Sequence, residues 1–156
     1  MRFLKKLSYL AYITRHRAYV LYAGIVQVGG IPLKTLLLHD LSKFTATEFP
    51  TYRQRFYGAE NEEPPPQSAW DLAWLHHLHH NAHHPEFWMI DGRPIPMPEK
   101  YIREMVADWL AVSIEKKDDF RRWLQIASKK TYHEDTKVIL ARVLRELGFV
   151  VDFPET

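Results

Sequence analysis

The amino-acid sequence predicts an all-α protein that folds as a single domain, and three observations lead to this expectation. Apolar side chains recur at steps of three and four residues through most of the chain, which is the period of an α-helix. The segments between these stretches are short and rich in proline or glycine. Neither half of the 156 residues has a hydrophobic core of its own. We therefore expect one domain over residues 1–156, with about six or seven helices and a small loop or hairpin flap around residues 85–97.

The composition is that of a globular protein. Hydrophobic residues make up 46% and charged residues 26% of the chain, and the net charge is only +2, which gives no strong argument for nucleic acid. No run of about 18 apolar residues indicates a membrane helix. The basic N-terminus is not followed by a small-residue cleavage site, so we expect a cytoplasmic protein. The sequence does not indicate an oligomeric state. The absence of cysteine leaves histidine and carboxylate side chains as metal ligands.

A long first helix is expected over residues 3–27, ended by the glycine pair at 29–30. Six residues form the stripe predicted to face the core: Leu4, Leu7, Ala11, Thr14, Ala18 and Leu21. His16 lies beside this stripe, and a packing or hydrogen-bonding role is the simplest interpretation of a lone histidine there. His16 becomes a candidate metal ligand only in combination with the histidine and aspartate residues later in the chain.

A short second helix is expected to begin at Pro32. Its predicted buried face consists of Leu33, Leu36 and Leu37. Asp40 falls on the same face, where a carboxylate is costly unless it is paired or bound to a metal. His39 is adjacent to it, and Lys43 lies one turn beyond on the same side. The alternative for Asp40 is a helix-terminal residue that closes a turn.

The third helix is expected to start at residues 45–48, which have the spacing of a capping box ending in Glu48. Its aromatic residues suggest a packing face. Arg53 on this helix could meet an anion, and a solvated position is the alternative. Residues 60–67 form a polar loop with three successive prolines, which separates this helix from the next.

Six of the nine histidines lie between residues 76 and 84, in a helix expected to start near Ser68 and to end before Pro85. At about 100° per residue, these imidazoles would share one arc of about 160°, opposite Trp70 and Trp74. A solvent-facing helix rarely uses a whole face for histidine, and neutral imidazole is the commonest protein ligand of transition metals. An exposed histidine-rich face and hydrogen-bonded core histidines are the alternatives.

The flap and three more helices complete the chain. The Asp-Gly pair at 91–92 predicts a hairpin turn, and the prolines nearby confine it to a small ribbon. Pro98 opens a helix in which Asp108 lies in the middle of an apolar face. It is the second carboxylate expected to point inward, and a hydrogen-bonded structural aspartate is the alternative. Two further helices are expected at roughly residues 118–129 and 134–147.

Together these histidine and aspartate residues predict a metal site built from four successive helical elements. A mixed set of nitrogen and oxygen ligands suits one or two divalent transition-metal ions, such as Fe, Mn, Zn, Co or Ni. The predicted metal ligands are His16, His39, Asp40, His79, His83 and Asp108. His79 and His83 are preferred because they lie four residues apart. The spacing does not decide among the six clustered histidines, so His76, His80 and His84 are substitutes.

In this order, the residues resemble the pattern of the HD superfamily of all-α, metal-dependent enzymes, which has an early histidine, a His-Asp doublet and a late aspartate. The doublet His39-Asp40 with Lys43 after it looks like the doublet and trailing lysine of that superfamily, with Ser42 where glycine is common. Residues 83–86 (HHPE) resemble the His-His segment of the versions that carry two metals. The resemblance implies an HD-like bundle around a metal site.

A narrower resemblance connects three segments to a phage- and bacteria-associated family of unknown function, DUF5662. The segments are residues 39–52 (HDLSKFTATEFPTY), 73–88 (AWLHHLHHNAHHPEFW) and 97–109 (MPEKYIREMVADW). This resemblance implies a fold and a metal site and does not identify a substrate.

The function that we expect from these observations is metal-dependent hydrolysis of a nucleotide or another small phosphate ester. A metal-activated water would attack the ester, with Asp40 as a ligand at the reaction centre. Lys43 would be a catalytic residue that also binds the phosphate as a point charge. Arg53 is a weaker candidate for binding the phosphate. One alternative is a dinuclear-iron oxygenase, because some HD-superfamily members use the same ligands for O₂ chemistry. The other is a non-catalytic, histidine-rich metal-binding or interaction protein.

Overall fold

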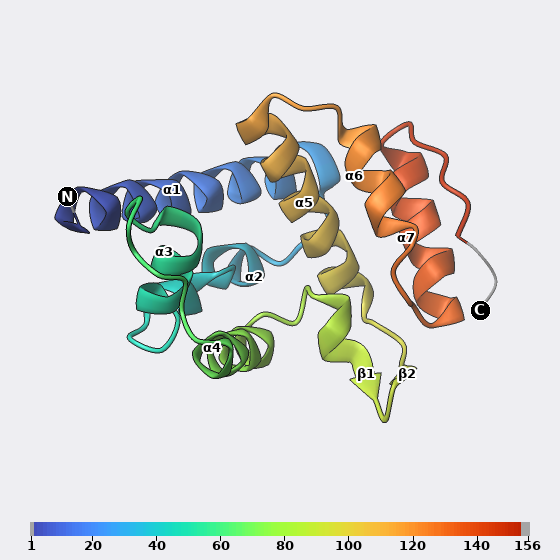
Figure 1. Ribbon diagram of the computed structural model, residues 1–156. Helices are drawn as coiled ribbons and strands as arrows, with labels where there is room; N and C mark the ends of the chain where they lie inside the picture. Colours follow the sequence, from blue (N-terminus) through green and yellow to red (C-terminus); the bar gives the residue numbers. More distant parts are fainter. Residues whose placement is uncertain (1, 154–156) are drawn as a thin grey trace.

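The computed structural model describes residues 2–153, and this part of the chain is mainly helical, as predicted (Figure 1). The α-helices are α1 (Arg2–Tyr22), α2 (Leu33–Leu38), α3 (Phe49–Tyr57), α4 (Gln67–His80), α5 (Glu99–Lys116), α6 (Phe120–Ala127) and α7 (Glu134–Glu146). The shorter elements are the π-helical turn η1 (Ala23–Val28), the 3-10 turns η2 (Leu41–Phe44) and η3 (Pro85–Trp88), and the strands β1 (Met89–Ile90) and β2 (Arg93–Pro94).

Helix α5 lies at the centre of the molecule and is contacted from two sides (Figure 1). Helix α1 and the turn η1 pack against one side, and α6 and α7 pack against the other. Helices α3 and α4 pack against each other, and α3 also packs against α1. The short α2 contacts α1, and the turn η2 that follows it contacts both α3 and α4. The segment that carries His39 and Asp40 therefore lies among the other helices.

Two clusters of buried apolar side chains result from this packing. The larger one is built on α5 and includes residues of η1, α6 and α7. The smaller one consists of Tyr9, Ile13, Tyr52 and Ala73, from α1, α3 and α4, with further aromatic rings packed against it. Helix α1 contributes to both, because Val20 belongs to the larger cluster. His16 lies on the same helix between Ile13 and Val20, so it occupies a polar region between two apolar ones.

The core-facing stripe predicted for the first helix is wrong. Leu4 and Leu7 of that stripe are 64% and 46% exposed, and Ala11, Thr14 and Ala18 are exposed as well. The buried face consists instead of Tyr9, Ile13, His16 and Val20. Both faces repeat at steps of three and four residues, so periodicity alone could not separate them on a helix with apolar residues all round. The face with Tyr9, Ile13, His16 and Val20 is the one that packs against α3 and α5.

The predicted face of the second helix also needs correction. Only Leu36 is buried, whereas Leu33 and Leu37 are exposed. Asp40 does not continue that helix, because α2 ends at Leu38.

Several local predictions are confirmed. The Asp-Gly pair at 91–92 forms the turn of a two-residue hairpin, in which Met89 pairs with Pro94 and Ile90 pairs with Arg93. Both turn residues have positive φ, 49° for Asp91 and 74° for Gly92, as such turns require. The last two helices lie within the predicted ranges. None of the described helices is both long and apolar enough to cross a membrane.

Candidate metal centre

Helices α1 and α5 and the turn after α2 bring four predicted ligands together. His16 Nε2 of α1 lies 2.9 Å from Asp108 Oδ1 of α5 and 3.9 Å from Asp40 Oδ2. His39 Nε2 lies 3.5 Å from the same Asp40 oxygen and 3.9 Å from Asp108 Oδ1. His16, His39 and Asp40 are buried, and the Asp108 side chain is 18% exposed. Side chains from three separate segments thus form one buried polar cluster.

The backbone at Asp40 has a conformation that places its carboxylate at the centre of this group. Its φ of 54° is left-handed, a region that aspartate enters more readily than most residues. The Asp40 backbone N–H donates to Asn81 Oδ1 at 2.9 Å, and Asn81 Nδ2 donates to Ser42 Oγ at 2.7 Å. Arg17 donates to the carbonyl oxygens of Leu37 and His39 just before the turn. These contacts fix the chain on both sides of Asp40.

A second group of histidines lies on the other side of the Asp40 carboxylate. His77 Nε2 lies 3.5 Å from Asp40 Oδ1 and 2.9 Å from His84 Nε2. The His83 and His84 rings are adjacent, with centroids 4.2 Å apart. Helix α4 ends at His80, and the chain then turns at Asn81, so the two histidines return toward the centre. Asp40 is therefore positioned between two groups of imidazole nitrogens.

Two glutamates that the sequence analysis did not select hold these imidazoles. Glu104 Oε1 on α5 lies 3.0 Å from His39 Nδ1 and 3.4 Å from His83 Nδ1. Glu48 lies 2.6 Å from His76 Nδ1 and 2.9 Å from His77 Nδ1, through its two separate oxygens. A carboxylate that accepts the Nδ1–H of a histidine fixes the ring and its tautomer, which leaves Nε2 available as a ligand. Both glutamates are in the position that supports a metal centre.

The central carboxyl groups are held in the ionised form. Burial raises the pKa of Asp40, but the nearby Lys43 ammonium outweighs this effect and leaves the pKa well below its usual range. Burial likewise raises the pKa of Asp108, and the hydrogen bond from His16 outweighs it, so this pKa is lowered too. Lys43 itself keeps its charge, because the attraction of Asp40 outweighs burial and raises the lysine pKa. Ionised carboxylates are the form that binds cations.

Two of the imidazoles are held in the neutral form. Burial lowers the pKa of His39, and burial together with the neighbouring His83 and His77 lowers the pKa of His84 far below its usual value. His83 differs: burial alone would lower its pKa, but the contact with Glu104 outweighs burial and raises it. Neutral imidazole is the form that binds a metal, so His39 and His84 are ready to act as ligands.

The donor atoms of the cluster and the distances between them could hold a metal ion. Three groups each place their ligand atoms within 4.8 Å of one another: His16–His39–Asp40, His39–His83–Asp108 and Asp40–His83–His84. Two ligands of one tetrahedral ion, each about 2.1 Å from it, lie about 3.4 Å apart, close to the separations at the centre. Among the described residues, His39 Nε2, His83 Nε2 and Asp40 Oδ1 are buried without a hydrogen-bond partner. A buried polar atom without a partner lowers the stability of the fold unless a ligand binds to it.

The cluster includes most of the predicted ligands and omits one. His16, His39, Asp40, His83 and Asp108 meet at the centre. His79 is exposed and belongs to none of the three groups found in the described chain. The reason is the direction of α4, whose inward face carries Ala73 and His77, so that His79 lies about 200° round the helix from His77. The predicted arc of six histidines fails beyond His80, because the helix ends there.

The two predicted phosphate-binding residues lie in different surroundings. The Lys43 ammonium is 2.5 Å from Asp40 Oδ2 and therefore lies directly at the centre. Arg53 is buried and makes two hydrogen bonds to the Glu62 carboxylate, at 2.5 and 2.8 Å. Within residues 2–153 no hydrogen bond or ion pair joins Arg53 to the cluster. Its contacts hold the loop after α3 in place.

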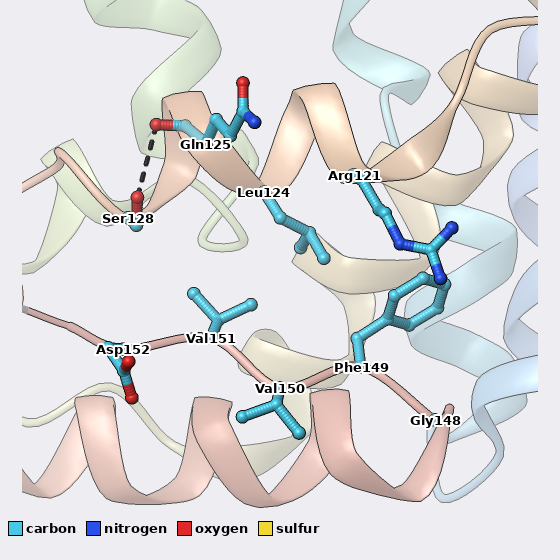
Figure 2. A pocket seen from close by; sticks show the side chains of 9 residues that line it. All are labelled: Arg121, Leu124, Gln125, Ser128, Gly148, Phe149, Val150, Val151 and Asp152. Carbon is cyan, nitrogen blue, oxygen red and sulfur yellow. Dashed lines mark hydrogen bonds between the residues drawn. The ribbon is translucent and has the colours of Figure 1, made fainter.

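The cavity between α6 and the segment after α7 is remote from this chemistry. It measures about 350 Å³, and Figure 2 shows Leu124 and Arg121 of α6 facing Val151 and Phe149 across it. Its described lining contains no histidine, and Asp152 is the single acidic residue in it. The buried cluster of histidines and aspartates is therefore the candidate site.

Comparison with known protein families gives a match over most of the chain. The family model described as "Family of unknown function (DUF5662)" matches residues 5–146. This span contains every residue of the cluster and both supporting glutamates. No curated protein and no solved structure matches the chain.

Proposed function

Because the chain belongs to DUF5662, a family of unknown function, we propose its activity from the site itself: hydrolysis of a phosphate ester at an HD-like centre of one or two divalent transition-metal ions. The observation that carries the proposal is the buried Asp40 carboxylate, which has histidine nitrogens on both sides and the Lys43 ammonium beside it. A small phosphate ester, such as a nucleotide, is the proposed substrate, and the cytoplasm is the proposed location.

The ligands divide into two sets that share Asp40. His16, His39 and Asp108 would hold one ion together with Asp40 Oδ2. The other carboxylate oxygen faces His77, and His83 and His84 complete a second set. A bound ion would lower the pKa of a coordinated water and stabilise negative charge on a phosphoryl oxygen.

The residues around the proposed ligands would bind the phosphate and keep the imidazoles oriented during hydrolysis. In hydrolysis the water oxygen bonds to phosphorus, the bond from phosphorus to the ester oxygen breaks, and one water proton passes to that oxygen, so the products are inorganic phosphate and an alcohol. Lys43 keeps a positive charge beside Asp40 and would attract the phosphoryl oxygens of the ester. Glu104 and Glu48 would keep the imidazoles oriented through the reaction.

The first test is the metal content of untagged protein, purified without chelator or nickel resin, together with Asp40→Ala and Asp108→Ala. We expect near-stoichiometric Fe, Mn, Zn or Co in the wild-type protein and loss of metal in both variants. Asp71→Ala is the matched control, because Asp71 is exposed on α4 and its carboxylate accepts a hydrogen bond only from Gln67 within residues 2–153. Release of inorganic phosphate from a panel of phosphate esters should be lost with the metal.

The variant Lys43→Ala separates substrate binding from metal binding. It should retain metal and lower phosphate-ester turnover, and unchanged kinetics would remove Lys43 from the site. Metal that survives both aspartate changes would refute the assigned ligands and favour a histidine-rich metal-binding protein. Two equivalents of redox-active iron with oxygen consumption and without phosphate release would favour an oxygenase instead.

A further inference from the structure

A cavity of about 480 Å³ opens between α1, α3 and α4, and its walls are mainly aromatic. Seven aromatic side chains line it, among them Tyr9 and Tyr12 of α1, Tyr52 and Phe56 of α3, and Trp70 and Trp74 of α4. Pockets that bury one small organic ligand usually measure about 300–1,000 Å³. The cavity is thus large enough for a single ligand of about the size of a nucleotide.

This cavity adjoins the metal centre and shares walls with it. The Tyr12 ring stacks on His16 with centroids 6.0 Å apart and an interplanar angle of 14°. The Trp74 ring stacks on His77 at 5.6 Å and 24°. Lys43 also lines the cavity, and its ammonium contacts Asp40. A ligand in the cavity would therefore lie next to the candidate reaction centre.

Two buried hydroxyl groups of the cavity wall lack a hydrogen-bond partner. Tyr9 is 2% and Tyr52 is 6% exposed, and within the described chain neither hydroxyl makes a hydrogen bond. Burial, with the nearby Asp40 and Glu48 carboxylates, raises the pKa of both phenols, so they remain protonated donors. Buried donors are nearly always paired in native proteins. Ligand oxygens in the cavity would satisfy both hydroxyls.

The charge around the cavity selects the kind of ligand. Aromatic walls bind flat rings by stacking and also bind organic cations. Lys43 and Lys116 line this cavity, and the Arg55 guanidinium lies over the Trp70 ring at 4.2 Å. Lys43 is paired with Asp40, whereas no ion pair is found for Lys116 or Arg55 within residues 2–153. The positive charge of the latter two would repel an organic cation and attract an anion. The combination therefore favours a flat, uncharged ring that carries an anionic group.

We propose that this aromatic cavity binds the organic part of the substrate, and that the substrate is a phosphate ester whose organic part carries a planar aromatic ring, of the size of a nucleoside monophosphate. The ring would stack between the aromatic walls while the phosphate reaches Lys43 and the metal centre. Tyr9 and Tyr52 would donate to oxygens of the ligand. The hydrolytic part of this inference rests on the proposed function, whereas the binding part can be measured separately.

The experiment compares ligands with and without a ring on metal-loaded, full-length protein. Binding of adenosine, guanosine, cytidine and uridine 5′-monophosphates is measured by calorimetry against ribose 5-phosphate, which keeps the sugar and the phosphate. At least one nucleotide should bind about tenfold more tightly than ribose 5-phosphate, as expected for stacking of one base. The value of kcat/KM for phosphate release should follow the same preference.

Three variants locate the binding. Phe56→Ala should lower nucleotide affinity roughly fivefold and leave ribose 5-phosphate unaffected, and the fold should tolerate it because Phe56 is 60% exposed. Tyr52→Phe keeps the ring, removes one donor and should lower nucleotide affinity roughly fivefold. The matched control is Tyr132→Phe, since Tyr132 is another buried hydroxyl without a partner in residues 2–153 and lies in the larger apolar cluster. It should change neither affinity.

Every outcome decides between the two proposals. Equal affinity for the nucleotides and ribose 5-phosphate, or unchanged nucleotide affinity in both cavity variants, overturns the assignment of the cavity even if phosphate esters are hydrolysed. Ring-dependent binding that the cavity variants weaken, without hydrolysis of any ester, supports the cavity and overturns the hydrolase. Absence of both binding and hydrolysis overturns both.

Discussion

Replacing Glu104 with glutamine tests how the histidines of the candidate metal centre are held. The Glu104 carboxylate is buried on α5 and lies 3.0 Å from His39 Nδ1 and 3.4 Å from His83 Nδ1. The substitution keeps the shape of the side chain and removes its negative charge. Glu104 is not itself a predicted metal ligand, so any change in metal affinity must pass through the orientation and basicity of the two imidazoles that it contacts.

The expected loss follows from these contacts. Removing the partner of one metal-binding histidine typically lowers metal affinity about 10- to 100-fold. The contact with His39 has the length of a full hydrogen bond and the contact with His83 is longer. We therefore expect the loss of metal affinity to correspond to one lost partner, within this range, and not to the product of two such losses. This corresponds to about 1.4–2.7 kcal/mol. Competition with a chromophoric chelator for Zn²⁺ or Mn²⁺ measures it directly.

The thermal stability of the metal-free protein separates this effect from unfolding. The glutamine oxygen can still accept from His39 Nδ1, so the free energy of unfolding should change by only about 1 kcal/mol. Glu99→Gln on the same helix is the control, because Glu99 pairs with Arg103 and Arg142 at the surface and is remote from the histidines. Unchanged metal affinity in a folded Glu104→Gln protein, or an equal loss in the control, would refute the reasoning.

Arg53→Ala should lower the free energy of unfolding by about 3 kcal/mol, because it removes the buried ion pair with Glu62; metal content per folded molecule should not change, and urea unfolding that matches the wild type would show that the pair is not structural. His79→Ala should leave the metal-to-protein ratio unaltered while His77→Ala lowers it, and equal ratios in elemental analysis would contradict the ligand assignment. Hydrogen bonds from two neighbouring arginines lower the pKa of Glu99 below its ordinary value of 4.5. Its small contribution to stability is therefore present above that pH and disappears as the pH falls through the lowered value. Glu99→Gln should accordingly be slightly less stable than the wild type near neutral pH, and this difference should shrink as the pH falls below 4.5; a difference in Tm that stays constant as the pH is lowered would argue against this pairing.

The helices were predictable because their signals are local. Proline and glycine mark the ends of α2 and α7, and the hairpin turn at residues 91–92 follows from its two residue types. Which face of a helix is buried was less predictable. Helix α1 has apolar residues on several sides, and the choice among them depends on α3 and α5, which the periodicity of α1 does not describe.

The aspartates of the site were predictable for a physical reason that does not apply to the glutamates. Asp108 interrupts an apolar face, so a single carboxylate there indicated an inward position. Glu104 lies one turn earlier on the same face but directly follows Arg103, and an Arg-Glu pair is typical of a solvated surface. Glu48 fits the spacing of a capping box, yet its carboxylate contacts His76 and His77 instead.

The choice of ligands among the clustered histidines depends on these glutamates. A histidine whose Nδ1 is held by a carboxylate presents Nε2 in a fixed direction, and hydrogen bonds of this kind hold His39, His76 and His77. Of these three, His39 and His77 also lie within 3.5 Å of the Asp40 carboxylate. Among the described contacts, His79 has no such partner, and His80 Nδ1 bonds to the carbonyl oxygen of His76. The carboxylates come from Glu48, just before α3, and from Glu104 on α5, and the reversal of the chain after His80 determines which imidazoles reach them. A pattern of identical residues within one helix contains neither kind of information, so the fold, rather than the spacing, determines which histidines are candidate ligands.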